Sequence, residues 1–225
     1  MLGLTGSTMT INWLVFAGLA ASTTVYNSTF DTAPAGQLPA EWTATMTNAG
    51  APPRWEVVKD RTAPTPPNVL AQTSGDKTDG RFPLAILNNL QFKDGEVSVR
   101  CKPVAGKEDR ACGLVWRYRD ENNYYLVRAN ALENNLVLYK VQNGKRTALI
   151  PKGMAKTAYG VHHPIPSNVW SLIKVVAKGP LFSVYFNHRQ LLQVEDRTFS
   201  GPGKVGLWTK ADSITYFDDF RVVER

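Results

Sequence analysis

Gly113-Leu-Val-Trp-Arg-Tyr-Arg-Asp-Glu-Asn-Asn-Tyr-Tyr-Leu-Val-Arg-Ala-Asn130 is the stretch of sequence that decides the fold. Two runs in it, residues 113–119 and 124–130, alternate with a period of two, which is the periodicity of a β-strand. Asp120-Glu-Asn-Asn123 lies between them as a turn, so the stretch predicts an antiparallel hairpin. Its expected inner side carries Leu114, Trp116, Tyr118, Tyr125, Val127 and Ala129, and its outer side Val115, Arg117, Arg119, Tyr124, Leu126, Arg128 and Asn130.

The rest of the chain repeats this pattern of short strands and turns. Further period-2 runs flank turn residues, namely residues 137–142 and 146–150 around Asn143-Gly144, and residues 170–177 and 181–186 around Lys178-Gly-Pro180. The last two expected strands are residues 205–209 and 214–222. Helical periodicity is absent, and 43% hydrophobic residues in 225 suffice for a full core. The sequence predicts an all-β, two-sheet antiparallel sandwich as a single domain of residues 25–225.

The first residues predict a leader. Residues 11–21 are apolar and are followed by Ser22, Thr23 and Thr24, as in a signal peptide with small residues near its cleavage point. The segment is shorter than the roughly 20 apolar residues that span a bilayer. Because no Lys or Arg precedes it, a buried first strand is the alternative. We expect residues 1–24 to be a leader, and the protein to be exported, periplasmic or extracellular, with no stable membrane span.

The chain is basic, with a net charge of +7 and a pI of about 9.4. Such a balance favours anionic partners, which include nucleic acid, membrane surfaces and acidic glycans. The basic residues are scattered, however, and form no run of five or six. Because no nucleic-acid-binding motif accompanies them, we do not expect nucleic acid as a partner.

Cys101 and Cys112 are the only cysteines. Their parity with Val99 and Leu114 turns both inward, and residues 103–110 between them read as a hairpin loop. A cross-strand disulfide and two free core thiols both agree with this pattern. No zinc site is expected from two cysteines and three histidines without HxH or HxxxH spacing, and no cofactor motif is present.

The outer side of the hairpin predicts a ligand-binding face. Arginine and asparagine side chains offer planar hydrogen-bonding groups for sugar hydroxyls and carboxylates, and a tryptophan offers a ring for the C–H face of a sugar. The expected ligand-binding residues are Arg100, Arg117, Arg128, Asn130, Lys140, Trp208 and Lys210. Two alternatives remain: a solvated face kept soluble by arginine, and a Trp208 covered by a loop as part of a secondary core.

The stretch 113–130 resembles the concanavalin A-like lectin/glucanase domains of bacterial exported proteins, in particular the 3-keto-disaccharide hydrolase domain group. Three later segments share the resemblance: Trp170-Ser-Leu-Ile-Lys-Val175, Phe182-Ser-Val-Tyr-Phe-Asn187, and Gly203-Lys-Val-Gly-Leu-Trp208 with Phe217-Asp-Asp-Phe-Arg-Val222. His188 stands where this family usually has glycine. The resemblance covers residues 28–224 and implies a two-sheet jelly roll with a concave sheet and glycan ligands. It does not by itself imply catalysis.

Catalysis would need a suitable pair of carboxylates, about 5–5.5 Å apart in a retaining glycosidase. The Glu-x-Asp-x-x-Glu motif of laminarinase-type members of this superfamily is absent. Glu133 and Asp212, each in a loop beyond an expected strand, are the candidate acid and base. Asp218-Asp219 either anchors the last strand or binds a structural cation such as calcium.

Three functions follow from these patterns. The first is an exported, lectin-like protein that binds a glycan on its concave sheet. The second is a glycoside hydrolase or lyase that acts on keto-disaccharides or oligosaccharides, and the third is a structural or adhesive protein of the cell envelope. The missing acid motif favours the first.

Overall fold

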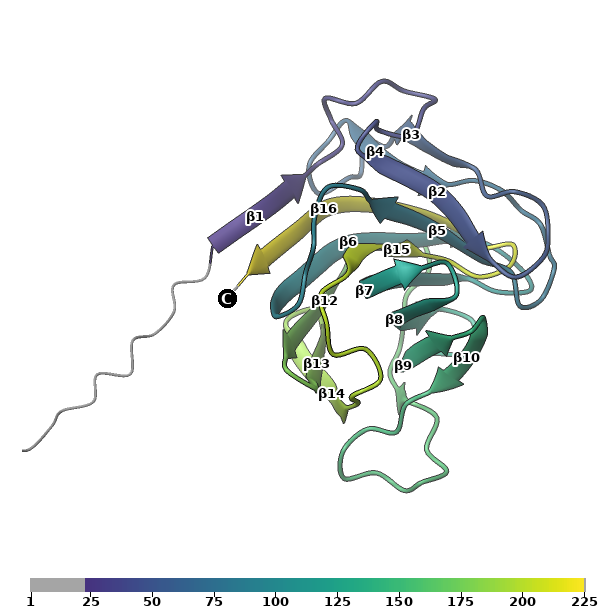
Figure 1. Cartoon of the computed structure of the whole chain (residues 1–225). Helices are drawn as coiled ribbons and strands as arrows, with labels where there is room; N and C mark the ends of the chain where they lie inside the picture. Colours follow the sequence, from purple (N-terminus) through teal and green to yellow (C-terminus); the bar gives the residue numbers. More distant parts are fainter. Residues whose placement is uncertain (1–22, 225) are drawn as a thin grey trace, which may run out of the picture.

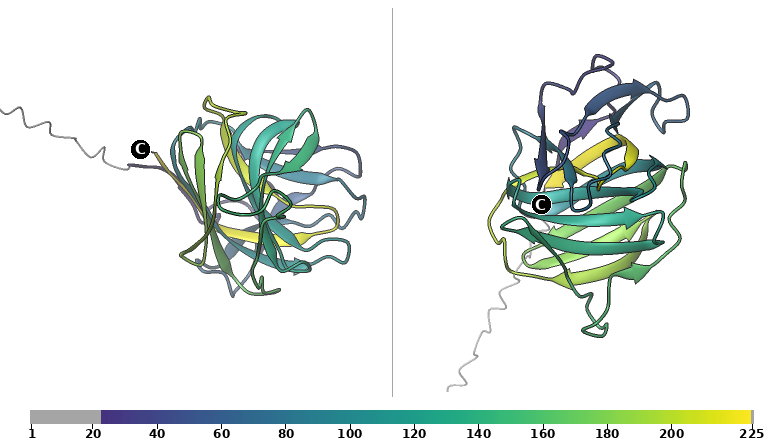
Figure 2. Two further views of the ribbon diagram at one scale, coloured as in Figure 1. Left: turned by 90° about the horizontal axis from the view of Figure 1, so that it is seen from below. Right: turned by 90° about the vertical axis from the view of Figure 1, so that its right-hand side faces the viewer.

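The computed structural model describes residues 23–224, which form two antiparallel sheets packed face to face (Figures 1 and 2). The predicted leader therefore lies outside the described residues, except for Thr23 and Thr24, which begin the first strand. No helix among the described residues is long and apolar enough to cross a membrane. The predicted fold class, an all-β two-sheet antiparallel sandwich, is confirmed.

Sheet A has eight strands in the order β14-β13-β12-β6-β16-β4-β3, with β1 paired to β16. Its strands are β1 (Thr23–Ser28), β3 (Trp55–Lys59), β4 (Asn68–Gln72), β6 (Gly95–Ala105), β12 (Ser171–Lys178), β13 (Leu181–Phe186), β14 (Arg189–Glu195) and β16 (Ile214–Glu224).

Sheet B also has eight strands, in the order β10-β9-β8-β7-β15-β5-β2, with β11 paired to β9. Its strands are β2 (Trp42–Thr47), β5 (Phe82–Leu87), β7 (Ala111–Asp120), β8 (Asn123–Asn130), β9 (Asn135–Gln142), β10 (Lys145–Ala148), β11 (Val161–His162) and β15 (Lys204–Trp208). The predicted hairpins β7–β8, β9–β10 and β12–β13 are all present.

One core fills the space between the sheets. Alternate residues of β6 and of β7 meet there, and Val99, Leu114 and Trp116 are fully buried. The aromatic rings of Trp116, Tyr125 and Phe182 pack together with centroid distances of 4.7–5.7 Å. Such rings bury large apolar areas and so contribute strongly to the stability of the sandwich.

Cys101 and Cys112 form a disulfide, but not within a hairpin. The predicted hairpin between their strands is wrong, because β6 belongs to sheet A and β7 to sheet B. The chain crosses from one sheet to the other through residues 106–110, and the disulfide spans the core between the sheets. The prediction that both cysteine side chains point inward is confirmed, because both are fully buried. They can meet because inward-facing residues of two facing sheets meet in the core.

Candidate functional site

The outer face of sheet B is not the polar face that the sequence predicted. It carries a second hydrophobic cluster, in which Phe82, Tyr124, Leu126, Tyr139 and Trp208 are buried. Trp208 has 0% of its surface exposed, so it belongs to a secondary core and is not an exposed stacking platform. The guanidinium of Arg146 covers this cluster, with its Cζ 4.6–5.7 Å from the ring centroids of Phe82, Tyr139 and Trp208.

Arg100 and Lys140 also lie away from the predicted face. Arg100 is on β6 of sheet A, where its Nε lies 3.3 Å from Oδ2 of Asp219. Lys140 pairs in register with Tyr125, an inward-facing residue, so Lys140 points toward the edge of the sandwich interior. Arg100 lies elsewhere because β6 and β7 belong to different sheets. Lys140 lies elsewhere because Tyr139, and not Lys140, faces outward in the register of β9.

Four of the predicted residues do come together at one end of sheet B. Arg128 donates two hydrogen bonds to Glu133, 3.0 Å from Nη1 to Oε1 and 2.6 Å from Nη2 to Oε2. Nδ2 of Asn130 lies 2.9 Å both from Glu133 and from Asp109. Lys210 completes the group, with its Nζ 3.1 Å from Asp109. We call Asp109, Arg128, Asn130, Glu133 and Lys210 the Glu133 network.

The two carboxyl groups of this network have opposite pKa shifts. Burial raises the pKa of Asp109, although the nearby charges of Lys210 and Arg128 oppose the shift. Burial also acts to raise the pKa of Glu133, but hydrogen bonds from Arg128 and Asn135 outweigh it and place the pKa below its ordinary value. The structure places Arg128 and Asn130 in this ion-paired network, with each side chain 1% exposed, so neither lies on an exposed binding face.

Asp212, the predicted partner of Glu133, has a structural role. Its carboxylate accepts hydrogen bonds from the backbone N–H groups of Lys107 and Asp109, at 2.8 and 2.9 Å, and also from that of Glu108. Asp212 is 5% exposed. It therefore holds the crossover between β6 and β7, and its carboxylate oxygens are already occupied. A catalytic role for Glu133 stays a prediction.

Asp218 and Asp219 anchor β16 to the loop between β3 and β4. Asp218 accepts hydrogen bonds from the backbone N–H groups of Thr65 and Asp219, at 2.8 and 2.7 Å. Asp219 accepts a hydrogen bond of 2.8 Å from the hydroxyl of Thr65. Burial raises the pKa of Asp218 to about 7. Within residues 23–224, no group of three or more His, Cys, Asp or Glu side chains is placed to hold a metal ion.

Arg117 is turned out of its predicted position by a β-bulge. The register of β7 shifts between Trp116 and Asp120 against β8, and Arg117 has a φ of 48°, in the left-handed region. An inserted residue in a strand shifts the following side chains to the other face. Arg117 is consequently 1% exposed and lies over the ring of Phe182, with its Cζ 5.1 Å from the centroid.

Arg117 links three segments that are distant in the sequence. Its Nε and Nη2 donate to the carbonyl of Lys93 at 3.1 and 3.0 Å, and Nη1 donates to the carbonyl of Phe199 at 2.8 Å. Nη2 also donates to the carbonyl of Gly179 at 2.6 Å. Gly203 allows the chain to pass here, because a Cβ at this position would lie 2.5 Å from the backbone of Arg117.

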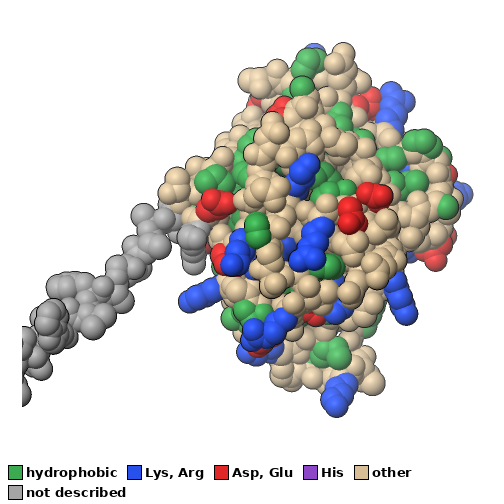
Figure 3. Space-filling view, in the orientation of Figure 1, with side chains coloured by type: hydrophobic (Ala, Val, Ile, Leu, Met, Phe, Trp, Pro, Cys, Tyr) green, Lys and Arg blue, Asp and Glu red, His purple; other side chains and the backbone are tan. Residues whose placement is uncertain are grey.

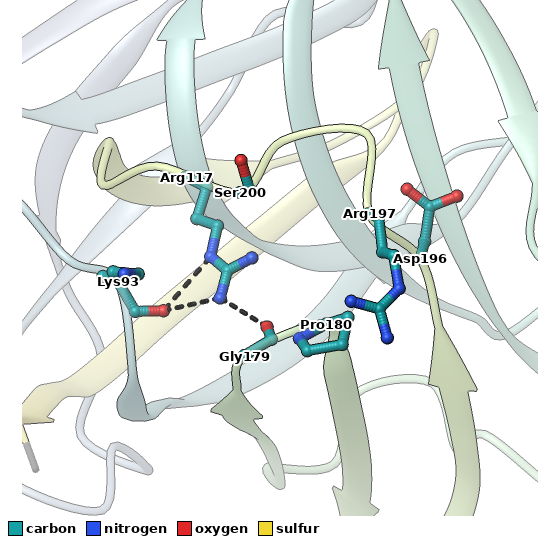
Figure 4. Close-up of a pocket in the computed structure, with 7 residues that line it drawn as sticks. All are labelled: Lys93, Arg117, Gly179, Pro180, Asp196, Arg197 and Ser200. Carbon is teal, nitrogen blue, oxygen red and sulfur yellow. Dashed lines mark hydrogen bonds between the residues drawn. The ribbon is translucent and has the colours of Figure 1, made fainter.

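A cavity of about 420 Å³ opens beside Arg117 at the edge of the sandwich (Figure 4). We call it the Arg117 cavity. Its lining comes from β7, the turn after β12, the loop after β14 and the segment before β6, and consists of Lys93, Arg117, Gly179, Pro180, Asp196, Arg197 and Ser200. Lys93 and Arg197 lie on opposite sides of the cavity in Figure 4. Volumes of 300–1,000 Å³ are typical of small-molecule sites.

Asp196 is held as an anion in the wall of this cavity. Its oxygens accept hydrogen bonds from Tyr125, Thr198 and Lys140, the last at 3.2 Å from Nζ. Burial acts to raise its pKa, but these hydrogen bonds outweigh burial and lower the pKa. Arg117 and Asp196 both line this cavity, and Lys140 bonds Asp196, so the predicted ligand residues Arg117 and Lys140 lie near the cavity and not on the outer face of sheet B.

Most of the residues that line the Arg117 cavity could not be predicted from the sequence. Lys93, Arg197 and Ser200 lie in loops without periodicity, so no strand pattern could place them. The one signal that the sequence carried was Gly203, which precedes a clear strand and marks a close approach of two backbones.

No family model matches the chain, and no curated protein matches it. Solved structures do match. A CBM66 carbohydrate-binding module from Bacillus subtilis has a TM-score of 0.58 and 20% identity, covering 80% of this chain and 93% of that one. A beta-glucanase from Bacillus licheniformis has a TM-score of 0.58 at 10% identity, covering 90% and 99%.

A third similar structure is domain 4 of an extracellular arabinanase from Geobacillus stearothermophilus, solved in complex with arabinotriose. It has a TM-score of 0.56 at 13% identity and covers 90% of this chain and 93% of that one. At these identities the likeness concerns the fold. It shows that the chain has the concanavalin A-like jelly-roll architecture that the sequence resemblance implied.

Proposed function

We propose that this chain is an exported protein that binds a carbohydrate in the Arg117 cavity. The observation that carries the proposal is a cavity of about 420 Å³ with charged and hydroxyl side chains on its walls. A site of that size accommodates one or two sugar rings, and sugars are bound through planar charged groups and hydroxyls. The fold agrees with the proposal, because the similar structures include a carbohydrate-binding module and an arabinotriose complex.

The wall of the cavity is suited to binding without rearrangement. Arg117 ties Lys93, Gly179 and Phe199 together through their backbone carbonyls. Such a frame reduces the entropy that is lost when a ligand orders its site. Export is supported by the Cys101–Cys112 disulfide, since disulfides persist in oxidising compartments.

The test is a glycan screen that reports binding and product release, followed by titration calorimetry on the best ligand. Ser200→Trp places a large side chain at the cavity, and we expect it to weaken binding at least tenfold. Thr32→Trp, in the exposed loop after β1, is the matched control and should bind as the wild type does. Equal affinity of Ser200→Trp and wild type would rule out this cavity as the site.

A hydrolase acting on keto-disaccharides or oligosaccharides is the second candidate. Asn130 bridges the carboxyl groups of Asp109 and Glu133, and their pKa values are shifted in opposite directions. Pairs of carboxyl groups with separated pKa values serve as acid and base in many enzymes. If the screen releases product, Glu133→Gln should lower turnover at least a hundredfold, and an unchanged rate would exclude Glu133.

A further inference from the structure

The walls of the Arg117 cavity are predominantly cationic. Three of its lining residues, Lys93, Arg117 and Arg197, carry a positive charge, and Asp196 alone carries a negative one. Figure 3 shows Lys and Arg side chains across the middle and lower part of the face that the loop between β14 and β15 crosses in Figure 1. Clustered charge of one sign in a cavity attracts ligands of the opposite sign.

The acidic groups near the cavity are already engaged. Asp196 accepts from Lys140 and Tyr125, and Asp94 accepts from Arg117 at 3.2 Å and from the backbone N–H of Gly179 at 2.7 Å. Glu195 pairs with Arg197 at 2.9 Å, but both side chains are exposed, with 45% and 75% of their surface accessible. Exposed pairs of this kind are weak, so Arg197 is available to a ligand.

Arg117 contributes its charge to the cavity and not a direct contact. Its side chain is 1% exposed, and the Nε, Nη1 and Nη2 of its guanidinium donate to carbonyl oxygens of Lys93, Phe199 and Gly179. Figure 4 shows this guanidinium on the Lys93 side of the cavity, across from Arg197. A buried charge is screened less than an exposed one, so it adds to the attraction of the cavity for an anion.

We propose that the sugar bound in the Arg117 cavity carries an anionic substituent, a carboxylate or a sulfate ester, held between Lys93 and Arg197. This inference rests on the proposed carbohydrate-binding function and specifies its ligand class. Both substituents are compact anions with several acceptor oxygens, so the same cations serve for either. Part of the net positive charge of the chain, +7 in total, then serves to bind the anion at this cavity.

The experiment compares matched ligands by titration calorimetry. An oligogalacturonate is titrated beside its methyl ester, which keeps the backbone and removes the charge, and beside a neutral and a sulfated galactan oligosaccharide. We expect the acid or the sulfated ligand to bind at least tenfold more tightly than the uncharged ligand of its pair. The carboxylate and sulfate arms identify which substituent the site takes.

Variants separate a built site from diffuse charge attraction. Lys93→Gln and Arg197→Gln should each weaken binding of the anionic ligand about tenfold, which corresponds to about 1.4 kcal/mol. Arg61→Gln removes an exposed charge from the loop between β3 and β4 and should leave the affinity unchanged at 0.15 M salt. An equal loss in all three variants would overturn the proposal.

The remaining outcomes distinguish this inference from the function on which it rests. Binding of the neutral and anionic sugars with equal affinity would overturn the anionic specificity and leave carbohydrate binding intact. An absence of binding to every glycan in the screen would overturn carbohydrate binding itself.

Discussion

Nη2 of Arg117 lies 2.6 Å from the carbonyl oxygen of Gly179, so a side chain of sheet B holds the turn between two strands of sheet A. The same guanidinium bonds the carbonyls of Lys93 and Phe199. These bonds fix three loops around one buried charge at the edge of the sandwich. The Arg117 cavity therefore depends on this residue for its shape.

Replacing Arg117 with lysine should destabilise the protein. Lysine keeps the charge, but its three N–H donors all sit on one nitrogen, so they cannot replace the Nε, Nη1 and Nη2 groups that reach three separate carbonyl oxygens. Hydrogen bonds to charged groups contribute about 1.5–3 kcal/mol each, so we expect the free energy of unfolding in urea to fall by about 3 kcal/mol. An unchanged unfolding curve would show that the three loops do not depend on this residue.

Trp208 should matter for stability and not for sugar binding. It is fully buried in the second hydrophobic cluster, so Trp208→Ala should cost about 3–5 kcal/mol of stability. Trp208→Phe keeps a ring in the cluster and should bind glycan with the wild-type affinity. A loss of affinity in the folded phenylalanine variant would restore the outer face of sheet B as a binding surface.

The disulfide between the sheets should stabilise the fold through its effect on the unfolded chain. Closing a loop over a sequence separation of 11 residues is worth about 3 kcal/mol. Reduction should lower the free energy of unfolding by this amount. A Cys101→Ala, Cys112→Ala double variant is the control, because its stability should not respond to reductant. A wild-type protein insensitive to reductant, with free thiols detected by mass spectrometry, would contradict the disulfide.

Asp212 gives a prediction with a defined dependence on pH. Burial acts to raise its pKa, but backbone N–H groups of Lys107, Asp109 and Glu108 outweigh burial and lower it. Its stabilisation is therefore present above the pKa of an unfolded aspartate, about 4, and is lost as the pH falls through the lower folded value. Asp212→Asn should cost about 1–3 kcal/mol at pH 7.

Denaturation at several pH values checks the sign of this effect. The difference between wild type and Asp212→Asn should shrink as the pH falls below about 4, since the wild-type carboxylate becomes protonated there. A difference that stays constant down to pH 2 would show that the charge of Asp212 does not support the crossover between β6 and β7.

The fold could be predicted from local patterns in the sequence, but the position of the candidate site could not. Alternation of apolar and polar residues and the turn residues Asn143-Gly144 located most strands, because a half-buried strand imposes a period of two. Sheet membership is not a local property, so the sequence predicts one hairpin for Cys101 and Cys112 although their strands lie in opposite sheets.

A single bulge had the largest effect on the predicted site. The left-handed φ of Arg117 shifts its side chain into the edge of the sandwich, and no simple parity count anticipates such an insertion. By contrast, Arg128, Asn130 and Glu133 do come together as their positions near one strand end suggested. What the sequence could not show is that they bond to one another and are largely buried.

The most direct test of the central claim is a ¹⁵N NMR titration of the protein with the glycan that binds best in the screen. We expect the amide shifts of Lys93, Gly179 and residues 196–200 to change with a single binding isotherm. The amides of Tyr139, Arg146 and Trp208, on the outer face of sheet B, should stay unchanged. Changes confined to that outer face, with none around the Arg117 cavity, would contradict carbohydrate binding in the cavity.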